Sequence, residues 1–134
     1  MGGTDFTHVV AGKTADDAFR KAQQDAEYDY GHSGYTGTVA EKPGFRLIEG
    51  PVKCRAKSDD LVNWIAESEC NENAPAIPKQ HRLWASKHVK QYTDKWGAAL
   101  AIELTGKEKA EWKKLNNLKG TQARVFVFFG VASC

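Results

Sequence analysis

Length, composition and charge already exclude several classes of protein. A chain of 134 residues with 41% apolar and 27% charged residues fits one globular domain and lies outside the composition of disordered chains. The net charge of +2 excludes a strongly basic or acidic protein, and the longest apolar run, residues 125–132, is too short to cross a bilayer. We therefore expect residues 1–134 to form a single domain without a membrane partner.

The cysteines predict the compartment. Cys54, Cys70 and Cys134 are an odd number without a close pair. Secreted chains of this length usually carry an even disulfide framework, and structural zinc sites usually include a Cys-x-x-Cys pair. The N-terminal residues also lack the basic and apolar regions of a secretory signal. The expected protein is cytoplasmic, with reduced thiols and no metal ion.

The N-terminal part of the chain predicts several strands and one helix. Alanines at helical spacing follow Thr14, which is expected to begin the helix, and Gly31 is expected to end it. A Gly-rich loop comes next, and Pro43 and Gly44 mark the turn of an expected hairpin. The strands expected in this part span residues 5–11, 38–41, 45–49 and 52–57.

The middle of the chain predicts a helix, a surface loop and a segment that is harder to assign. Ser58 is expected to cap a helix that has two aspartates in its first turn. Residues 71–78 include two prolines and are expected to form a loop. Residues 79–95 are expected to form a helix followed by extended chain, although residues 88–92 fit an edge strand equally well.

The C-terminal part predicts the centre of the sheet. A strand is expected over residues 98–104, followed by a helix that Thr105 and Glu108 open as a capping box. Residues 123–132 are apolar on both faces of an extended chain, which predicts the central strand. The side chains of the last helix that are expected to face the core are Trp112, Leu115 and Leu118.

This order of elements predicts an α+β fold. Helices and strands mix without a regular βαβ repeat. Such a pattern is typical of a two-layer sandwich, with helices packed on one face of a mainly antiparallel sheet.

The Gly-rich loop, residues 31–38, is the first candidate site. Glycines let backbone N–H groups converge on an anion, and His32 with Glu41 would be the natural acid–base pair of an enzyme. The loop is expected to lead into a strand, so it matches neither the phosphate loop of nucleotide-binding proteins nor the dinucleotide fingerprint, and no cofactor is expected. The alternative is a tight structural connection. The ligand- or partner-binding residues predicted here are His32, Tyr35, Thr36, Thr38, Glu41 and Lys42.

The second candidate site is the segment 79–96, in which basic and aromatic residues alternate against a single acid. Cations attract phosphates and aromatic rings stack on bases, so this composition suits single-stranded nucleic acid. In the alternative interpretation the tryptophans belong to the core and the lysines form a solvated face. The nucleic-acid-binding residues predicted here are Arg82, Trp84, Lys87 and Lys90.

No catalytic signature is complete. The sequence contains neither a His-Glu-x-x-His pair nor a Gly-x-Ser-x-Gly elbow, so no catalytic residue and no metal ligand is predicted. The charge is segregated along the chain, since residues 58–75 carry five acids and no base whereas residues 76–100 carry five Lys or Arg residues and one acid. Segregated charge predicts a protein partner or a homo-oligomer, or complementary surfaces within one molecule.

Two segments of the chain resemble one group of known proteins. The run Tyr-Gly-His-Ser-Gly-Tyr-Thr-Gly-Thr-Val-Ala-Glu-Lys, residues 30–42, is similar to a motif of short uncharacterised proteins of prokaryotes and their phages. Asp-Lys-Trp-Gly, residues 94–97, resembles a second part of that pattern. The resemblance implies a compact accessory protein of a mobile element and implies no activity.

The function expected from the sequence is therefore that of a small intracellular accessory protein. It is expected to be non-enzymatic and to act by binding a host macromolecule. The alternative is a nucleotide- or nucleic-acid-binding protein, or an enzyme, that uses the Gly-rich loop and the segment 79–96.

Overall fold

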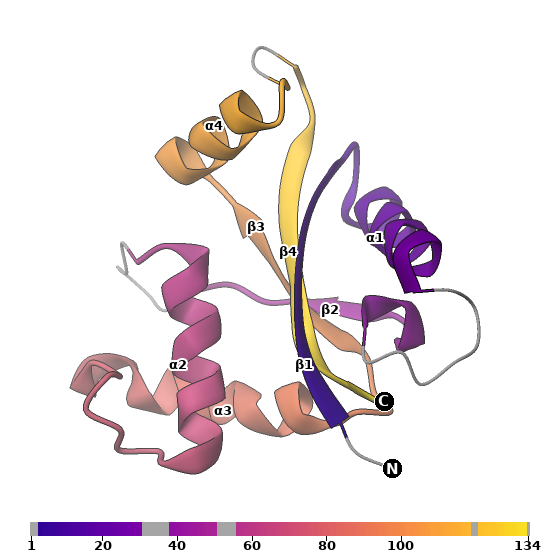
Figure 1. Cartoon of the computed structure of the whole chain (residues 1–134). Coiled ribbons are helices and arrows are strands. Elements are labelled where there is room, and N and C mark those ends of the chain that lie inside the picture. The colour runs from indigo at the N-terminus through magenta and orange to yellow at the C-terminus, as the bar shows by residue number, and fades with distance from the viewer. Residues whose placement is uncertain (1–2, 31–37, 51–55, 119–120, 134) are drawn as a thin grey trace.

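The computed structural model of the chain describes residues 3–30, 38–50, 56–118 and 121–133, and Figure 1 shows their arrangement. Short 3₁₀ helices span Val39–Glu41 and Lys79–His81. The helices of the described residues are α1 (Ala15–Tyr30), α2 (Ser58–Cys70), α3 (Arg82–Thr93) and α4 (Gly106–Leu115). The strands are β1 (Gly3–Gly12), β2 (Phe45–Leu47), β3 (Ala99–Leu104) and β4 (Arg124–Ser133).

The strands form one mixed sheet in the order β1-β4-β3-β2. Strand β4 runs antiparallel to both of its neighbours, whereas β2 runs parallel to β3. Every side chain from Val125 to Phe129 is fully buried, because both faces of β4 are covered. The central place of β4, the α+β class and the mainly antiparallel sheet are confirmed.

The helices cover both faces of the sheet rather than one. Ala18 and Ala22 of α1 pack with Phe126 and Phe128 on one face. Helices α2 and α3 lie on the opposite face, where Ile65 joins the core of that side (Figure 1). This differs from the expected two-layer arrangement, and the cause is β4 itself. A strand that is apolar on both faces needs a covering layer on each side.

The expected hairpin after the Gly-rich loop is absent from the described residues. The segment Val39–Glu41 is a 3₁₀ helix, and the Thr38 hydroxyl accepts a hydrogen bond from the Ala40 N–H at 3.3 Å. The side-chain amide of Gln23 on α1 donates to the carbonyl of Lys42 at 2.8 Å and holds this segment against the helix. Most of the strand expected over residues 52–57 lies outside the described residues, because residues 52–55 are not described.

The predicted strand at residues 45–49 exists as β2, but it pairs with a distant part of the chain. Its partner β3 follows α2 and α3 in the sequence, and the pairing is parallel. A parallel pair needs a long crossover connection, which the helices supply here. Residues 88–92, which also fitted an edge strand, belong to α3.

The expected capping box of α4 acts on a different helix. The Glu108 carboxylate accepts hydrogen bonds from the Ser58 backbone N–H at 3.1 Å and from its hydroxyl at 2.7 Å. Thr105 is the N-cap residue of α4 and makes no side-chain cap hydrogen bond. Glu108 therefore caps α2 from α4. Trp112 packs against the core as expected, whereas Leu115 is 82% exposed and does not face inward.

Candidate functional site

The first predicted site divides into residues that the structure describes and residues that it does not. His32, Tyr35 and Thr36 lie outside the described residues, so the expected His32–Glu41 pair stays a prediction. Thr38 caps the short 3₁₀ helix, which also contains Glu41. Among the described members of this site, Thr38 therefore has a structural role, because its hydroxyl caps the 3₁₀ helix.

Lys42 points into the protein and not toward solvent. Its side chain is 3% exposed, and its Nζ donates to the backbone carbonyl of Asp94 at 2.8 Å. Burial lowers the pKa of Lys42, and the Asp94 carboxylate opposes part of that shift. The same carboxylate accepts the backbone N–H groups of Trp96 and Gly97 and so closes a turn. The segments 38–42 and 94–97 therefore meet here in a structural contact.

The second predicted site also divides, because its residues lie on different sides of α3. The Arg82 guanidinium donates to the carbonyls of Ile77 and Ala74 at 3.1 and 3.3 Å and holds the loop before the helix. The Trp84 indole N–H donates to the Glu49 carbonyl at 3.0 Å. Both side chains have structural roles in the described chain. Lys87 and Lys90 are exposed on α3, one turn apart.

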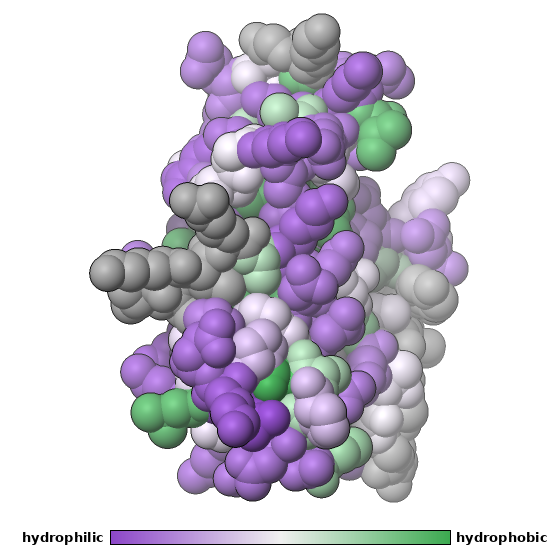
Figure 2. Space-filling view, turned by 90° about the vertical axis from the view of Figure 1, so that its left-hand side faces the viewer, coloured by the Kyte–Doolittle hydropathy of each residue, from purple (hydrophilic) through white to green (hydrophobic). Residues whose placement is uncertain are grey.

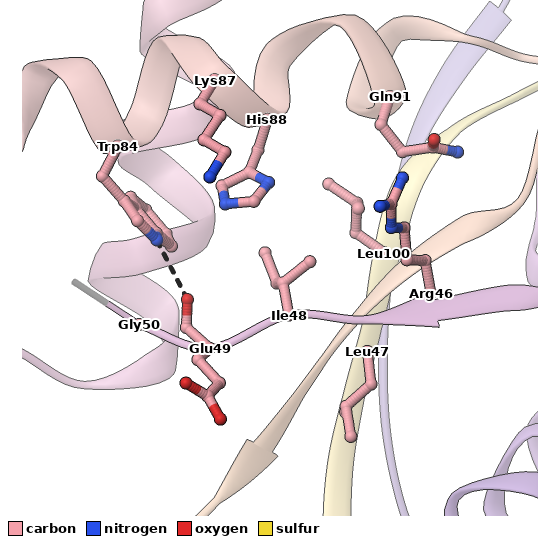
Figure 3. Close-up of a pocket in the computed structure, with 10 residues that line it drawn as sticks. All are labelled: Arg46, Leu47, Ile48, Glu49, Gly50, Trp84, Lys87, His88, Gln91 and Leu100. Atoms are coloured by element: carbon pink, nitrogen blue, oxygen red, sulfur yellow. Dashed lines mark hydrogen bonds between the residues drawn. The ribbon is translucent and has the colours of Figure 1, made fainter. Parts of the chain in front are cut away.

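A groove with a volume of about 430 Å³ lies between β2 and α3 (Figure 3). Residues one helical turn apart on α3 form one wall, because positions 84, 87, 88 and 91 share a face of the helix. The other wall is the chain from Arg46 to Gly50, and the apolar floor includes Ile48 and Leu100.

Basic side chains converge on this groove from two elements. Arg46 on β2 and Lys87 on α3 both lower the pKa of His88, after the larger effect of burial (Figure 3). Glu49 is the acidic residue among those that line the groove, and its carboxylate points away from the basic side chains (Figure 3). Neither Arg46 nor Lys87 forms an ion pair within the described part of the chain. Among the described residues, the positive charge of the groove therefore has no ion-pair partner, and it lies above an apolar floor.

The sequence interpretation included His88 and Gln91 only as part of the segment 79–96, and it missed Arg46 as a member of this site. The helical spacing of positions 84, 87, 88 and 91 was visible, but no local pattern places Arg46 opposite them. That placement comes from the parallel pairing of β2 with β3, where Arg46 lies beside Leu100.

A second, smaller hollow of about 220 Å³ is lined by Glu103 and Glu108. Both carboxylates already have partners, since Glu103 forms two hydrogen bonds with Arg124 and Glu108 caps α2. Within the described ranges, no cluster of His, Cys, Asp or Glu side chains has the arrangement of a metal site. The hollow offers no free carboxylate for a cation.

Figure 2 shows the side of the molecule on which α2, α3 and α4 lie. Its surface is mostly hydrophilic, and apolar side chains are scattered over it. Leu83 and Leu115 are among the exposed apolar residues of these helices. Recognition through a broad apolar patch on this side is therefore not supported. In the described part of the chain, no helix has the length and apolar character needed to cross a membrane.

No protein-family model, curated protein or solved structure matches the chain.

Proposed function

We propose that this chain is a non-enzymatic accessory protein that binds a partner protein in the groove between β2 and α3. The partner contributes a negatively charged segment. The proposal keeps the mobile-element role that the sequence resemblance implies, in which the partner is a host macromolecule.

The observation that carries the proposal is the charge inside the groove. Arg46 and Lys87 reach it from different elements, and neither is neutralised by a described acid. Acidic side chains of an incoming segment would gain charge-assisted hydrogen bonds from them. They would also favour the protonated form of His88, whose pKa burial now lowers.

The groove suits a protein segment better than a nucleic acid. Single-stranded nucleic acids need a basic track along the phosphates and exposed aromatic faces for stacking. Here the basic side chains that line the groove are Arg46 and Lys87 with His88, and the Trp84 ring is partly buried and fixed by its hydrogen bond to Glu49. The apolar floor of Ile48 and Leu100 fits aliphatic side chains next to the acidic ones.

The test is a binding titration followed by fluorescence anisotropy. Labelled polyglutamate is titrated with the protein and with the double variant Arg46→Gln/Lys87→Gln. We expect this variant to bind at least about tenfold more weakly, since truncating one side of a charge pair commonly costs more than 1.4 kcal/mol. The same titration with labelled oligothymidylate tests the nucleic-acid alternative.

The matched control is the double variant Lys13→Gln/Lys21→Gln. It changes the net charge equally, and both lysines are exposed near α1, away from the groove lining. The control is expected to bind like the unmodified protein. Equal losses in both variants would show that only net charge matters and would contradict a site in the groove. Stronger, groove-dependent binding of the oligonucleotide would replace the protein partner by a nucleic acid.

A further inference from the structure

We infer that the partner segment binds as an added β-strand on the free edge of β2. This inference rests on the proposed function and adds the binding mode and the conformation of the partner. The occupant is an acidic segment in extended conformation, lying between β2 and α3 and hydrogen-bonded to the backbone of β2.

The backbone of β2 alternates between a bonded and a free side. The Ile48 N–H donates to the Ala101 carbonyl at 2.8 Å, and the Gly44 carbonyl accepts from the Ala99 N–H at 2.9 Å. Even-numbered positions of β2 therefore bond to β3. Since successive residues of a strand direct their backbone groups to opposite sides, the N–H and C=O of Leu47 point to the outer edge.

Within the part of the chain that the structure describes, the outer edge of β2 is open along the groove. Strand β2 is the last in the sheet, so no described strand pairs with its outer side. The described partner on that side is the Trp84 indole, which occupies the Glu49 carbonyl at the end of the edge. Between this contact and the start of β2, the backbone groups of Leu47 form no hydrogen bond with a described residue. An exposed strand edge of this kind is a template for strand addition.

The side chains beside the edge select the chemistry of the added strand. Arg46 and Ile48 point toward α3, whereas Leu47 points to the other side of the sheet (Figure 3). An added strand has the same alternation, so every second side chain would face Arg46, Lys87 and His88. Acidic residues at those positions meet positive charge.

The length of the edge limits the bound segment. The edge from Phe45 to Glu49 spans roughly 13 Å, since it consists of four steps of about 3.3 Å each. The partner therefore contributes about five residues in direct contact with β2. Two or three of these residues would face α3, on the side of Arg46 and Lys87.

A second copy of this chain is a poorer occupant than an acidic partner. Pairing β2 with β2 of another molecule would bring the Arg46 side chains of both copies to neighbouring positions on one face. Like charges at such positions destabilise a strand pair. Charge complementarity therefore selects an acidic partner over self-association through this edge.

The first experiment uses short synthetic peptides in which glutamate and valine alternate. One peptide is N-methylated on the glutamates and a second on the valines, so each lacks the N–H groups on one side of the strand. In strand addition only one side bonds to β2, and we expect one of the two peptides to lose at least about tenfold in affinity while the other keeps it. Equal affinity of the two N-methylated peptides overturns strand addition.

The second experiment follows amide hydrogen exchange of the full chain by NMR. Without peptide, the Leu47 amide is expected to exchange fast, because it has no described partner. The unmethylated peptide should slow exchange at Leu47, while the Ile48 amide, already bonded to Ala101, changes less. Saturation with peptide that leaves Leu47 exchange unchanged overturns the inference.

The two experiments separate this inference from the proposed function. Groove-dependent binding of the peptide without protection of Leu47 leaves an acidic protein partner in place and removes only the strand geometry. If the unmethylated peptide does not bind while oligothymidylate binds through Arg46 and Lys87, both the acidic protein partner and its strand geometry are contradicted.

Discussion

The two outer edges of the sheet are held in different ways. Strand β1 is 10 residues long and pairs with β4 from the Gly3–Ser133 pair to the Gly12–Arg124 pair. Strand β2 is 3 residues long and has a short parallel pairing with β3. Its C-terminal end is fixed by a side chain, through the hydrogen bond from Trp84 to Glu49. One edge is thus fixed by a backbone ladder and the other by contacts with a helix.

The charges near the two edges differ as well. On β1, the Asp5 carboxylate faces the buried Tyr92 hydroxyl, and the His8 Nε2 lies 3.7 Å from the Asp25 Oδ2. Burial and the Asp5 carboxylate raise the pKa of Tyr92, so it stays a neutral donor. Near β2, Arg46 and Lys87 lack such partners among the described residues. On the proposed function, an acidic segment would therefore find charge complementarity at the edge of β2.

The largest effect is expected from alanine at two glycines next to these edges. A Cβ on Gly12, at the end of β1, would lie 2.7 Å from the Ala18 backbone nitrogen of α1, which cannot move aside alone. We expect Gly12→Ala to lower the free energy of unfolding by about 1–3 kcal/mol. A Cβ on Gly44, before β2, would contact nothing within 4 Å. Gly44→Ala should leave stability unchanged or raise it by about 0.4–1 kcal/mol.

Urea unfolding of both variants measures this difference. The two substitutions add the same methyl group, so the effect on the unfolded chain is shared and the native environments differ. Equal destabilisation by both would show that the β2 side is packed as tightly as the β1 side, which contradicts the contrast between the edges.

The central features of the fold could be predicted from the sequence because they depend on local patterns. Residues 125–129 are apolar without alternation, which places them between two layers. Thr14 was expected to open the first helix, and its hydroxyl accepts the Asp17 N–H at 3.2 Å. The shared helical face at positions 84, 87, 88 and 91 also follows from spacing alone.

The remaining features depend on contacts between distant segments. Glu108 has the spacing of a local capping box, yet its carboxylate caps Ser58, 50 residues earlier in the chain. Lys42 follows a Gly-rich loop and was predicted to bind a ligand or partner. In the structure, its Nζ donates a hydrogen bond to the backbone carbonyl of Asp94. Arg46 joins the groove only through the parallel pairing of β2. Local spacing identifies which groups need partners, and tertiary structure decides which partners they find.

A smaller effect is expected when the contact that fixes β2 is removed. Trp84→Phe keeps an aromatic ring and removes the indole N–H from the Glu49 carbonyl. We expect a loss of about 1 kcal/mol, and amide exchange at Ile48 should become faster relative to the amides of β4. Uniform acceleration across the sheet would mean that this contact supports the whole fold and does not specifically hold the β2 edge.

The smallest effect concerns the titration of His88 in the groove. Burial lowers its pKa from the ordinary value of 6.5, and Lys87 and Arg46 add to the shift. The folded protein therefore binds this proton less readily than the unfolded chain, so the stability that neutral His88 contributes is present above pH 6.5 and is lost as the pH falls.

Lys87→Gln removes one repelling charge, and NMR titration should show a higher His88 pKa that stays below 6.5 because burial remains. Lys87→Gln should also lose less stability between pH 7.5 and pH 5 than the unmodified protein. The control is Lys90→Gln, at the next turn of α3, which should shift the pKa of His88 less than Lys87→Gln does. Equal shifts in the two variants would contradict a specific convergence of Lys87 and Arg46 on His88. The positive charge would then be spread along α3, and the β2 edge would lose the feature that distinguishes it from β1.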